Sequence, residues 1–356
     1  MDPRIRKLAQ TVVRYSLCVK PDSYVIVSGG EESREFILEL YKEIIFRGAH
    51  PVLNVGLNGI SDFFYKYASD EQLEKFPDLR MHEVKKSQYY VGINTTGNTR
   101  ELSGIDPKKI MTRRKVIQPL LDYVVNRKDK IKRVTVGFPC MALAQEAEMS
   151  FNEYENFVFS ACLIDWKKFG KKLDKIARRF EKGKEVWLKG ENVDLRFSIK
   201  GKNCVSDKGE ENMPGGEVFM APVRESLNGW IFFEYPAIYS GKEINGIFLR
   251  FENGKVVEHS ADKNEDLLRE VLETDDNSSY VGEFGIGCNP GIKKYTKNLL
   301  FDEKIHGTIH LALGMAYKEN GGGNDSAIHW DIVKDMKNSK IFLDGKIIQD
   351  NKRWRI

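Results

Sequence analysis

The hydrophobic pattern of this chain changes near residues 182–184, and this change most constrains the fold. Before it, short apolar runs such as Tyr24–Ser28 alternate with segments of helical spacing such as Glu31–Phe46. That alternation predicts parallel strands joined by right-handed helical crossovers. After it, short runs of alternating polarity are separated by Gly and Asn-Gly, which predicts antiparallel strands and hairpins.

Two domains follow from this pattern, because 356 residues exceed what one hydrophobic core usually serves. We expect an α/β N-terminal domain with a parallel sheet over residues 1–184. A mixed, mostly antiparallel α+β C-terminal domain is expected over residues 185–356.

The same periodicity predicts the individual elements. Strands of the first domain are expected at residues 24–28, 51–57, 89–94 and 134–137. Its helices are expected at residues 5–15, 31–46, 60–67, 107–125 and, in two or three pieces, 141–181. Strands of the second domain are expected in EVWLKG, VDLRFSIKGK, GWIFFEY and GIFLRFENGKVVEHS, and one helix at residues 262–273.

The charge balance gives no reason to expect a nucleic-acid partner. The chain has 56 basic and 52 acidic residues, a net charge of only +4, whereas nucleic-acid binding rests on a strong basic excess. The basic run at residues 126–134 is interpreted as a solvated helix end rather than a phosphate-binding patch.

The cysteines and the absence of targeting signals predict a cytoplasmic protein. The five cysteines are odd in number, widely spaced and without a CxxC pair, so we expect reduced thiols. Cys288 is expected to be a buried small apolar residue. The N-terminal segment lacks the apolar core of a secretory signal, and no run of eighteen uncharged apolar residues suggests a membrane span.

A group of potential metal ligands is concentrated in residues 283–331 and one upstream turn. Glu283, His310, His329 and Asp331 lie among glycines and short apolar runs, and Glu217 follows a Pro-Gly-Gly turn. If His329-Trp330-Asp331 is a strand, His329 and Asp331 share one face, with Cα atoms about 7 Å apart. Imidazole and carboxylate together suit a borderline-soft divalent cation.

The number of donors indicates two metals rather than one. Five ligands are too many for a tetrahedral zinc that keeps one position open for water. Two ions that share a bridging carboxylate and a bridging water would use all five, an arrangement suited to hydrolysis. Each residue has a plainer interpretation, since a histidine such as His310 in an apolar run is often a structural core residue. His306 is interpreted as an incidental surface residue.

Four motifs in this order resemble the thermophilic-type metalloaminopeptidases, peptidase family M29. They are NMPGGEVFMAP, GEFGIGCNPGI, LLFDEKIHGTIHLALGMAY and SAIHWDIVKDM, and the N-terminal VVRYSLCVKPDSYVIVSG resembles the start of the family. The resemblance covers nearly the whole chain. It implies two divalent metal ions, zinc or cobalt, the release of N-terminal amino acids, and a homodimer that encloses a cavity.

The resemblance also assigns residues. It implies that the metal ligands are Glu217, Glu283, His310, His329 and Asp331, that the catalytic residues are Glu283 and Tyr317, and that the C-terminal domain is catalytic. Glu303 also belongs to the pattern, and its role as a ligand or as a carboxylate that orients one stays open.

The implied reaction is hydrolysis of the N-terminal peptide bond of short peptides by a water that bridges the metals. Glu283 or Glu217 would take the proton of that water and pass it to the leaving amine. Tyr317 would donate a hydrogen bond to the tetrahedral oxyanion. The alternatives are another di-metal hydrolase, such as an esterase or amidohydrolase, and a non-catalytic metal-binding module. No membrane or nucleic-acid partner is expected.

Overall fold

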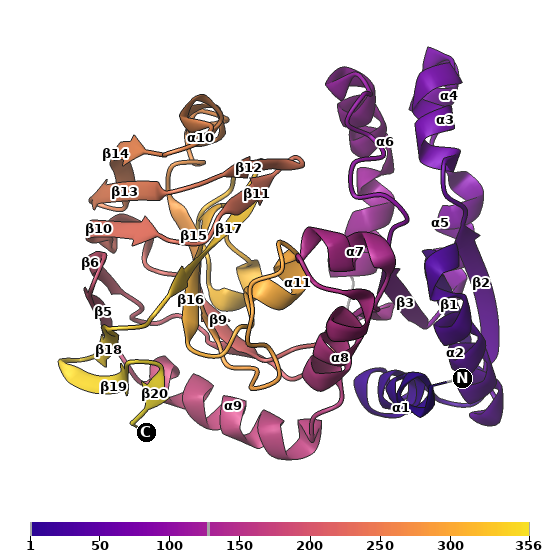
Figure 1. Cartoon of the computed structure of the whole chain (residues 1–356), viewed down its shortest axis with the longest axis horizontal. Coiled ribbons are helices and arrows are strands. Elements are labelled where there is room, and N and C mark those ends of the chain that lie inside the picture. The colour runs from indigo at the N-terminus through magenta and orange to yellow at the C-terminus, as the bar shows by residue number, and fades with distance from the viewer. Residues whose placement is uncertain (1, 127–128, 356) are drawn as a thin grey trace. The chain divides into compact units, whose positions relative to one another are not determined.

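The computed structural model describes residues 2–126 and 129–355, which form two compact units (Figure 1). Unit 1 comprises the chain through Leu163 together with Gly209–Pro214. Unit 2 comprises Ile164–Lys208 and the chain from Gly215 onward. Each unit contains its own sheets, and each is described separately below.

Unit 1 is built on a parallel five-stranded sheet of order β2-β1-β3-β4-β8, as the alternation of strand and helix signals predicted. Its strands are β1 (Tyr24–Gly30), β2 (His50–Gly56), β3 (Tyr89–Asn94), β4 (Lys132–Gly137) and β8 (Asn212–Met213). Its helices are α1 (Pro3–Thr11), α2 (Arg34–Phe46), α3 (Ile60–Tyr67), α4 (Asp70–Glu74), α5 (Asp78–Lys86), α6 (Pro107–Asn126), α7 (Met141–Glu146) and α8 (Phe151–Cys162). Strand β1, which lies between β2 and β3, is buried at Val25, Ile26 and Val27, as expected where helices cover both faces of a parallel sheet.

Unit 2 contains two antiparallel sheets, which confirms the predicted change of architecture. The larger has the order β14-β13-β10-β6-β5-β18-β19-β20. Its strands are β5 (Glu185–Gly190), β6 (Val193–Ser198), β10 (Asn228–Phe233), β13 (Ile247–Glu252), β14 (Lys255–Ser260), β18 (Ser339–Leu343), β19 (Lys346–Asp350) and β20 (Arg353–Trp354). The smaller, called sheet C here, has the order β17-β16-β15-β9-β7. Its strands are β7 (Val205–Asp207), β9 (Glu217–Met220), β15 (Val281–Gly287), β16 (Thr308–Gly314) and β17 (His329–Asp335).

Three α-helices and a short hairpin accompany these sheets in the described part of unit 2, besides the short 3-10 helices Arg224–Ser226 and Lys318–Asn320. The three α-helices are α9 (Trp166–Glu181), α10 (Glu265–Leu272) and α11 (Leu299–Asp302), and the hairpin consists of β11 (Ala237–Tyr239) and β12 (Lys242–Ile244). α10 begins later than predicted, because Asn264 before it adopts a left-handed backbone with φ of 61°. The helical hydrogen bonds therefore begin only after Asn264.

One apolar core joins α9 to the sheets of unit 2. Phe284 of β15 is fully buried, and its ring centroid lies 5.0 Å from that of Phe197 on β6 and 6.3 Å from that of Phe180 on α9. Leu173 and Ile176 of α9 belong to the same cluster. α9 therefore packs with the strands that follow it.

This packing places the division between the units earlier than the predicted boundary. The units separate at Leu163 and Ile164, and Gly209–Pro214 returns to unit 1 as β8, which pairs with β4. Because α9 is rich in charged residues, we expected it to be the last helix of the N-terminal domain. Its charged side chains lie on the exposed side of the helix, however, and its apolar side chains belong to the core of unit 2. Whether residues 1–184 and 185–356 behave as folding domains stays a prediction.

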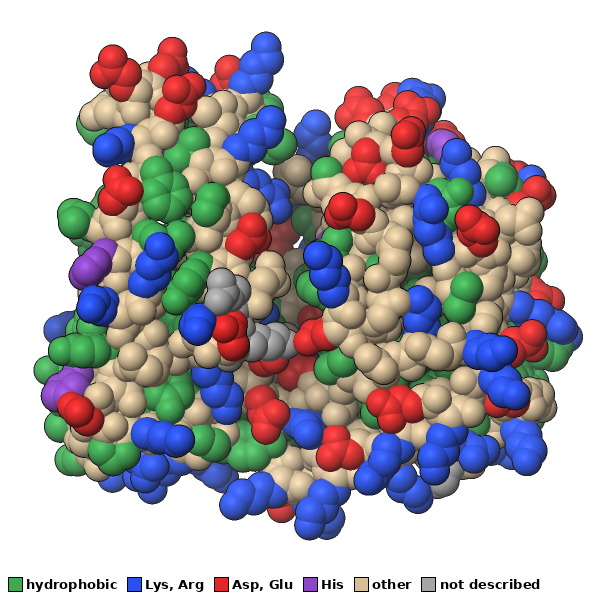
Figure 2. All heavy atoms as spheres, turned by 180° about the vertical axis from the view of Figure 1, so that it is seen from behind, with side chains coloured by type: hydrophobic (Ala, Val, Ile, Leu, Met, Phe, Trp, Pro, Cys, Tyr) green, Lys and Arg blue, Asp and Glu red, His purple; other side chains and the backbone are tan. Residues whose placement is uncertain are grey.

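Within residues 2–126 and 129–355, no helix has both the length and the apolar character needed to cross a bilayer. Acidic and basic side chains are both spread over the face shown in Figure 2. Arg127 and Lys128 of the predicted solvated helix end lie outside the described residues.

Cys288 is buried, in agreement with its interpretation as a small apolar residue.

Candidate metal centre

The two faces of sheet C differ in chemistry, and this difference creates the candidate site. Along β15, Phe284 and Ile286 point into the apolar core. Because side chains alternate across a strand, Glu283, Gly285 and Gly287 lie on the opposite face. The core therefore holds the sheet from one side, and the other side carries the polar residues.

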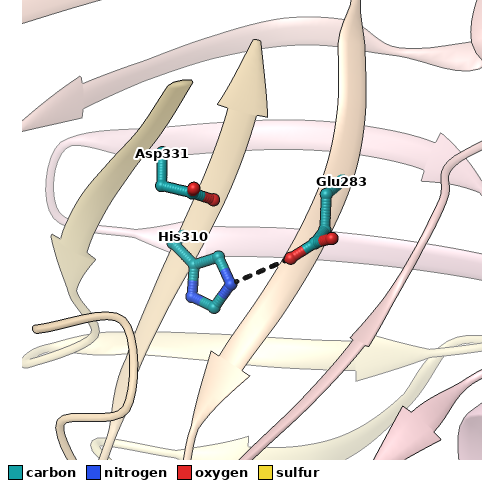
Figure 3. A group of neighbouring side chains, drawn as sticks. All are labelled: Glu283, His310 and Asp331. Atoms are coloured by element: carbon teal, nitrogen blue, oxygen red, sulfur yellow. Dashed lines mark ion pairs between the residues drawn. The ribbon is translucent and has the colours of Figure 1, made fainter. Parts of the chain in front are cut away.

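Three ligand-type residues from adjacent strands meet on this face (Figure 3). Glu283 of β15, His310 of β16 and Asp331 of β17 are all buried and offer ligand atoms that lie within 4.8 Å of one another. The register explains the meeting, since Glu283 and Asp331 both pair with Ala312, one from each side. The small side chain of Ala312 leaves room for the two carboxylates to approach.

Gly285 provides the space for the imidazole of His310. The two residues are directly opposite in the β15–β16 pair. A Cβ atom at Gly285 would lie 1.9 Å from His310 Nε2, far inside van der Waals contact. The glycine in the GEFGIG motif is therefore required by the position of the histidine ring.

Glu217 extends the group toward β9. Its Oε2 lies 3.3 Å from His310 Nε2, while His310 Nε2 lies 3.4 Å from Glu283 Oε1. Its other oxygen, Oε1, lies 3.3 Å from Lys304 Nζ. Glu217 thus connects the histidine to a buried lysine.

His329 extends the group in the other direction. Its Nδ1 lies 2.8 Å from the carbonyl oxygen of Met315, and because a carbonyl only accepts, Nδ1 carries the hydrogen. A neutral ring then leaves the lone pair on Nε2, the tautomer that binds a metal. That Nε2 lies 3.5 Å from Asp331 Oδ2. The half-buried ring of Tyr317 packs beside His329, with centroids 4.9 Å apart.

Burial and mutual charge shift the pKa values of Glu217, His310, His329 and Lys304. Burial raises the pKa of Glu217 well above its usual range, although Lys304 and His310 act in the opposite direction. Burial alone would lower the pKa of His310, but Glu283, Glu217 and Asp331 raise it to about 9. The pKa of His329 is also raised, against the effect of burial, chiefly by Asp331. The pKa of Lys304 is raised by Glu217, Glu303 and Asp207, also against burial.

These residues fit a divalent cation, because buried polar atoms of the group have no hydrogen-bond partner among the described residues. The atoms are Glu217 Oε2, Glu283 Oε2, Asp331 Oδ1 and both ring nitrogens of His310. Buried polar atoms are normally paired, so an unpaired set in one place indicates a missing partner. Carboxylate oxygens and imidazole nitrogens are the donors that zinc and related ions accept.

The structure brings all five predicted ligands into one chain of contacts, with Tyr317 packed against His329. Their individual roles stay predictions. His306, expected at the surface, is instead half-buried, and burial lowers its pKa. It lies outside the group of three that meet at the centre.

Sequence reasoning missed Lys304 and Asp207. Lys304 is fully buried beside Glu217, Glu303 and Asp207. A lysine next to Glu303 in an otherwise apolar segment was a possible signal. Lysine is usually exposed, however, so the sequence alone did not favour burial.

Comparisons with known proteins agree with this geometry. A family model described as thermophilic metalloprotease (M29) matches residues 1–349. Aminopeptidase AmpS of Bacillus subtilis strain 168 is 26% identical over 377 residues, covering 95% of this chain and 90% of that protein. Aminopeptidase T of Thermus thermophilus is 27% identical over 396 residues, covering 96% and 95%. The solved structure of wild-type AmpT from Thermus thermophilus matches with a TM-score of 0.87 at 24% identity and 99% coverage of both chains, which shows a common fold.

Replacing Gly285 with alanine should displace the His310 ring and weaken metal binding. We expect a loss of about tenfold or more in affinity for zinc, since even residues that only orient ligands contribute this much. Titration against a competing chelator measures it. Gly104→Ala is the control, because no atom lies within 4 Å of its added Cβ. Equal affinity in both variants would contradict the role given to Gly285.

Metal affinity should rise with pH. In the metal-free protein the pKa of His310 is about 9, so at pH 7 its ring is protonated and must lose that proton before it binds a metal. Affinity should therefore increase up to about tenfold per pH unit for each proton released as pH rises toward that pKa. Isothermal titration calorimetry with cobalt in buffers of different ionisation enthalpy counts the protons. Binding without proton release at pH 7 would be inconsistent with this electrostatic description.

Proposed function

We propose that this chain, which belongs to the thermophilic metalloprotease family (M29), is a metal-dependent aminopeptidase that removes N-terminal residues from short peptides. The main support for this proposal is the family match over residues 1–349. Sheet C of the same chain also has carboxylates and a histidine within metal-binding distance of one another. The aminopeptidase names of the relatives from Bacillus subtilis and Thermus thermophilus support the exopeptidase assignment.

We further propose two divalent ions, zinc or cobalt, as cofactors. Glu217, Glu283, His310, His329 and Asp331 would hold them. Unpaired buried atoms support four of these residues, and the Nδ1 contact of His329 with Met315 O supports the fifth by leaving its Nε2 for a metal. When bound, such ions supply Lewis acidity that polarises a carbonyl and lowers the pKa of water. Glu303, whose carboxylate contacts Lys304 Nζ, is not included in this set.

The proposed roles of the protein groups follow from their positions. Glu283, at the centre of the group, accepts the proton of the attacking water and returns it to the leaving amine. Glu217 is less suited to this role, since one of its two oxygens faces Lys304. Tyr317 lies at the half-exposed side, next to His329, where its hydroxyl donates a hydrogen bond to the tetrahedral oxyanion.

The alternative functions are separated from this one by substrate and by turnover. An esterase or amidohydrolase with the same centre would not require a free N-terminal amine. A non-catalytic metal-binding module would bind metal without turnover. The complete set of ligand-type residues favours an active enzyme over such a module.

The zinc- or cobalt-loaded protein should hydrolyse leucine-p-nitroanilide and should lose this activity on chelation. It should not cleave N-acetyl-leucine-p-nitroanilide, which lacks the free amine. Glu283→Gln should lower kcat by about 10²–10⁴-fold, the usual contribution of a general base. Glu265→Gln, an exposed glutamate of α10, should leave kcat unchanged. Cleavage of simple esters without cleavage of the anilide would refute the aminopeptidase assignment.

We propose that the protein forms a homodimer through an apolar surface of unit 1. This surface is defined as Leu38, Tyr41, Ile45, Leu53, Val55, Phe63 and Tyr67, each between 41% and 70% exposed. The three α2 residues lie on one side of that helix by their spacing, and α2 packs on β1 and β2. Figure 2 shows apolar side chains standing among charged ones over unit 1. Exposed apolar side chains in such a concentration mark interaction sites.

The edge strand β2 argues for a second copy as the partner. Within the described residues β2 pairs only with β1, and its sequence HPVLNVG carries no Lys, Arg, Asp or Glu. Edge strands are normally protected by charge, and here Pro51 near the start is the only common protective residue. The same strand in a second copy can pair with it across a twofold axis, so that one surface serves both subunits.

Wild-type protein should therefore elute with a mass twice the chain mass of 40.9 kDa in size-exclusion chromatography with light scattering. Val55→Lys should shift it to the monomer, because a charge on the paired edge opposes association. Val257→Lys is the matched control, since Val257 lies on the edge strand β14 with 47% exposure against 46% for Val55. A monomeric wild type, or a dimer in Val55→Lys, would contradict this interface.

We also propose a cytoplasmic location. All five cysteines, which lie within the described residues, are thiols rather than disulfide partners. Thiols of this kind persist in a reducing compartment.

A further inference from the structure

Lys304 is a buried cation surrounded by carboxylates. Its side chain has no solvent exposure, and its Nζ contacts Glu303, lies 3.3 Å from Glu217 Oε1 and lies 4.0 Å from Asp207 Oδ2. The backbone holds it in place, because Lys304 N donates to Phe301 O and Lys304 O accepts from Asn289 N, both at 3.0 Å. A lysine without solvent exposure does not reach a substrate in solution.

Lys304 shares Glu217 with the metal ligands. One oxygen of Glu217 faces the lysine, and the other faces His310 and has no hydrogen-bond partner among the described residues. The lysine therefore lies directly behind one of the proposed ligands.

The formal charges around the centre explain why a cation is needed there. Asp207, Glu217, Glu283, Glu303 and Asp331 are five carboxylates, four of them buried and Glu303 partly buried. Two divalent ions and one lysine carry as many positive charges as these five groups carry negative ones. Without the ions, the described contacts place two cations among them, Lys304 and the ring of His310, and unpaired buried charges are strongly destabilising.

We propose that Lys304 is a permanent internal counter-ion, which holds the acidic centre together before metal binds and completes its charge balance afterwards. This inference rests on the proposed di-metal function. It assigns Lys304 a positioning role for Glu217 rather than contact with substrate.

The test compares Lys304→Met with wild type in thermal unfolding, without metal and with saturating zinc. Removing the lysine from a centre without metal takes away the cation beside Asp207, Glu217 and Glu303, so the metal-free Tm should fall by roughly 6–20 °C. Zinc supplies positive charge to the same centre, so the difference in Tm between variant and wild type should become smaller on loading.

Lys334→Met is the matched control. Lys334 is also without solvent exposure and pairs with Glu234, but its Nζ contacts none of the five carboxylates in the described contacts. Its Tm loss should be equal in both states. A Tm loss in Lys304→Met that is equal or larger with zinc would overturn the proposal and indicate a purely structural or ligand-positioning lysine.

A second variant keeps the test decisive if Lys304→Met does not fold. The double variant Lys304→Met with Asp207→Asn removes one charge of each sign. The double variant should fold, and without metal its Tm should be higher than that of Lys304→Met alone. A double variant that is no more stable than Lys304→Met would refute charge compensation.

Wild type that binds zinc but does not cleave leucine-p-nitroanilide would overturn only the proposed function. Wild type that binds no zinc would overturn both.

Discussion

Repulsion between carboxylates buried on one face of sheet C is the interaction on which the rest of unit 2 depends. Glu217, Glu283 and Asp331 each lie at no more than 6% exposure, where like charges interact strongly because little water screens them. Such a group persists only if rigid surroundings hold it and cations compensate it. The opposite face of the same strands supplies the rigidity, since Phe284 and Ile286 are locked into the core. The functional face is therefore positioned by residues that have no chemistry of their own.

Close approach of ligands from three strands requires small residues between them. Gly285 makes room for the His310 ring, and Ala312 separates Glu283 from Asp331. These positions are set by strand register, because a shift of one residue would turn each ligand toward the core. The wild-type AmpT structure from Thermus thermophilus has the same fold at 24% identity.

The sequence predicted the parts of this arrangement that leave a periodic or compositional signal. Alternation placed His329 and Asp331 on one face of a strand, and the change of period identified a parallel sheet followed by antiparallel ones. The sequence did not predict the packing of α9, since its charged surface hides an apolar side whose Phe180 lies beside Phe284 of β15. Nor did it predict the environment of Lys304. Glu303 is its neighbour in the sequence, but Asp207 and Glu217 are about ninety residues away, and only the tertiary fold brings them to the lysine.

The two ends of the ligand group differ in exposure, and this difference assigns their roles. At the Glu217 end, His310 and Lys304 have no solvent exposure. At the Asp331 end, the His329 side chain is 19% exposed and Tyr317 is half-buried beside it. A group that stabilises a reacting substrate must be accessible to it, whereas a group that compensates charge acts most strongly where water is excluded. These exposures support the proposed oxyanion donor at Tyr317 and the proposed counter-ion at Lys304, and an exchange of these roles would conflict with the burial of each side chain.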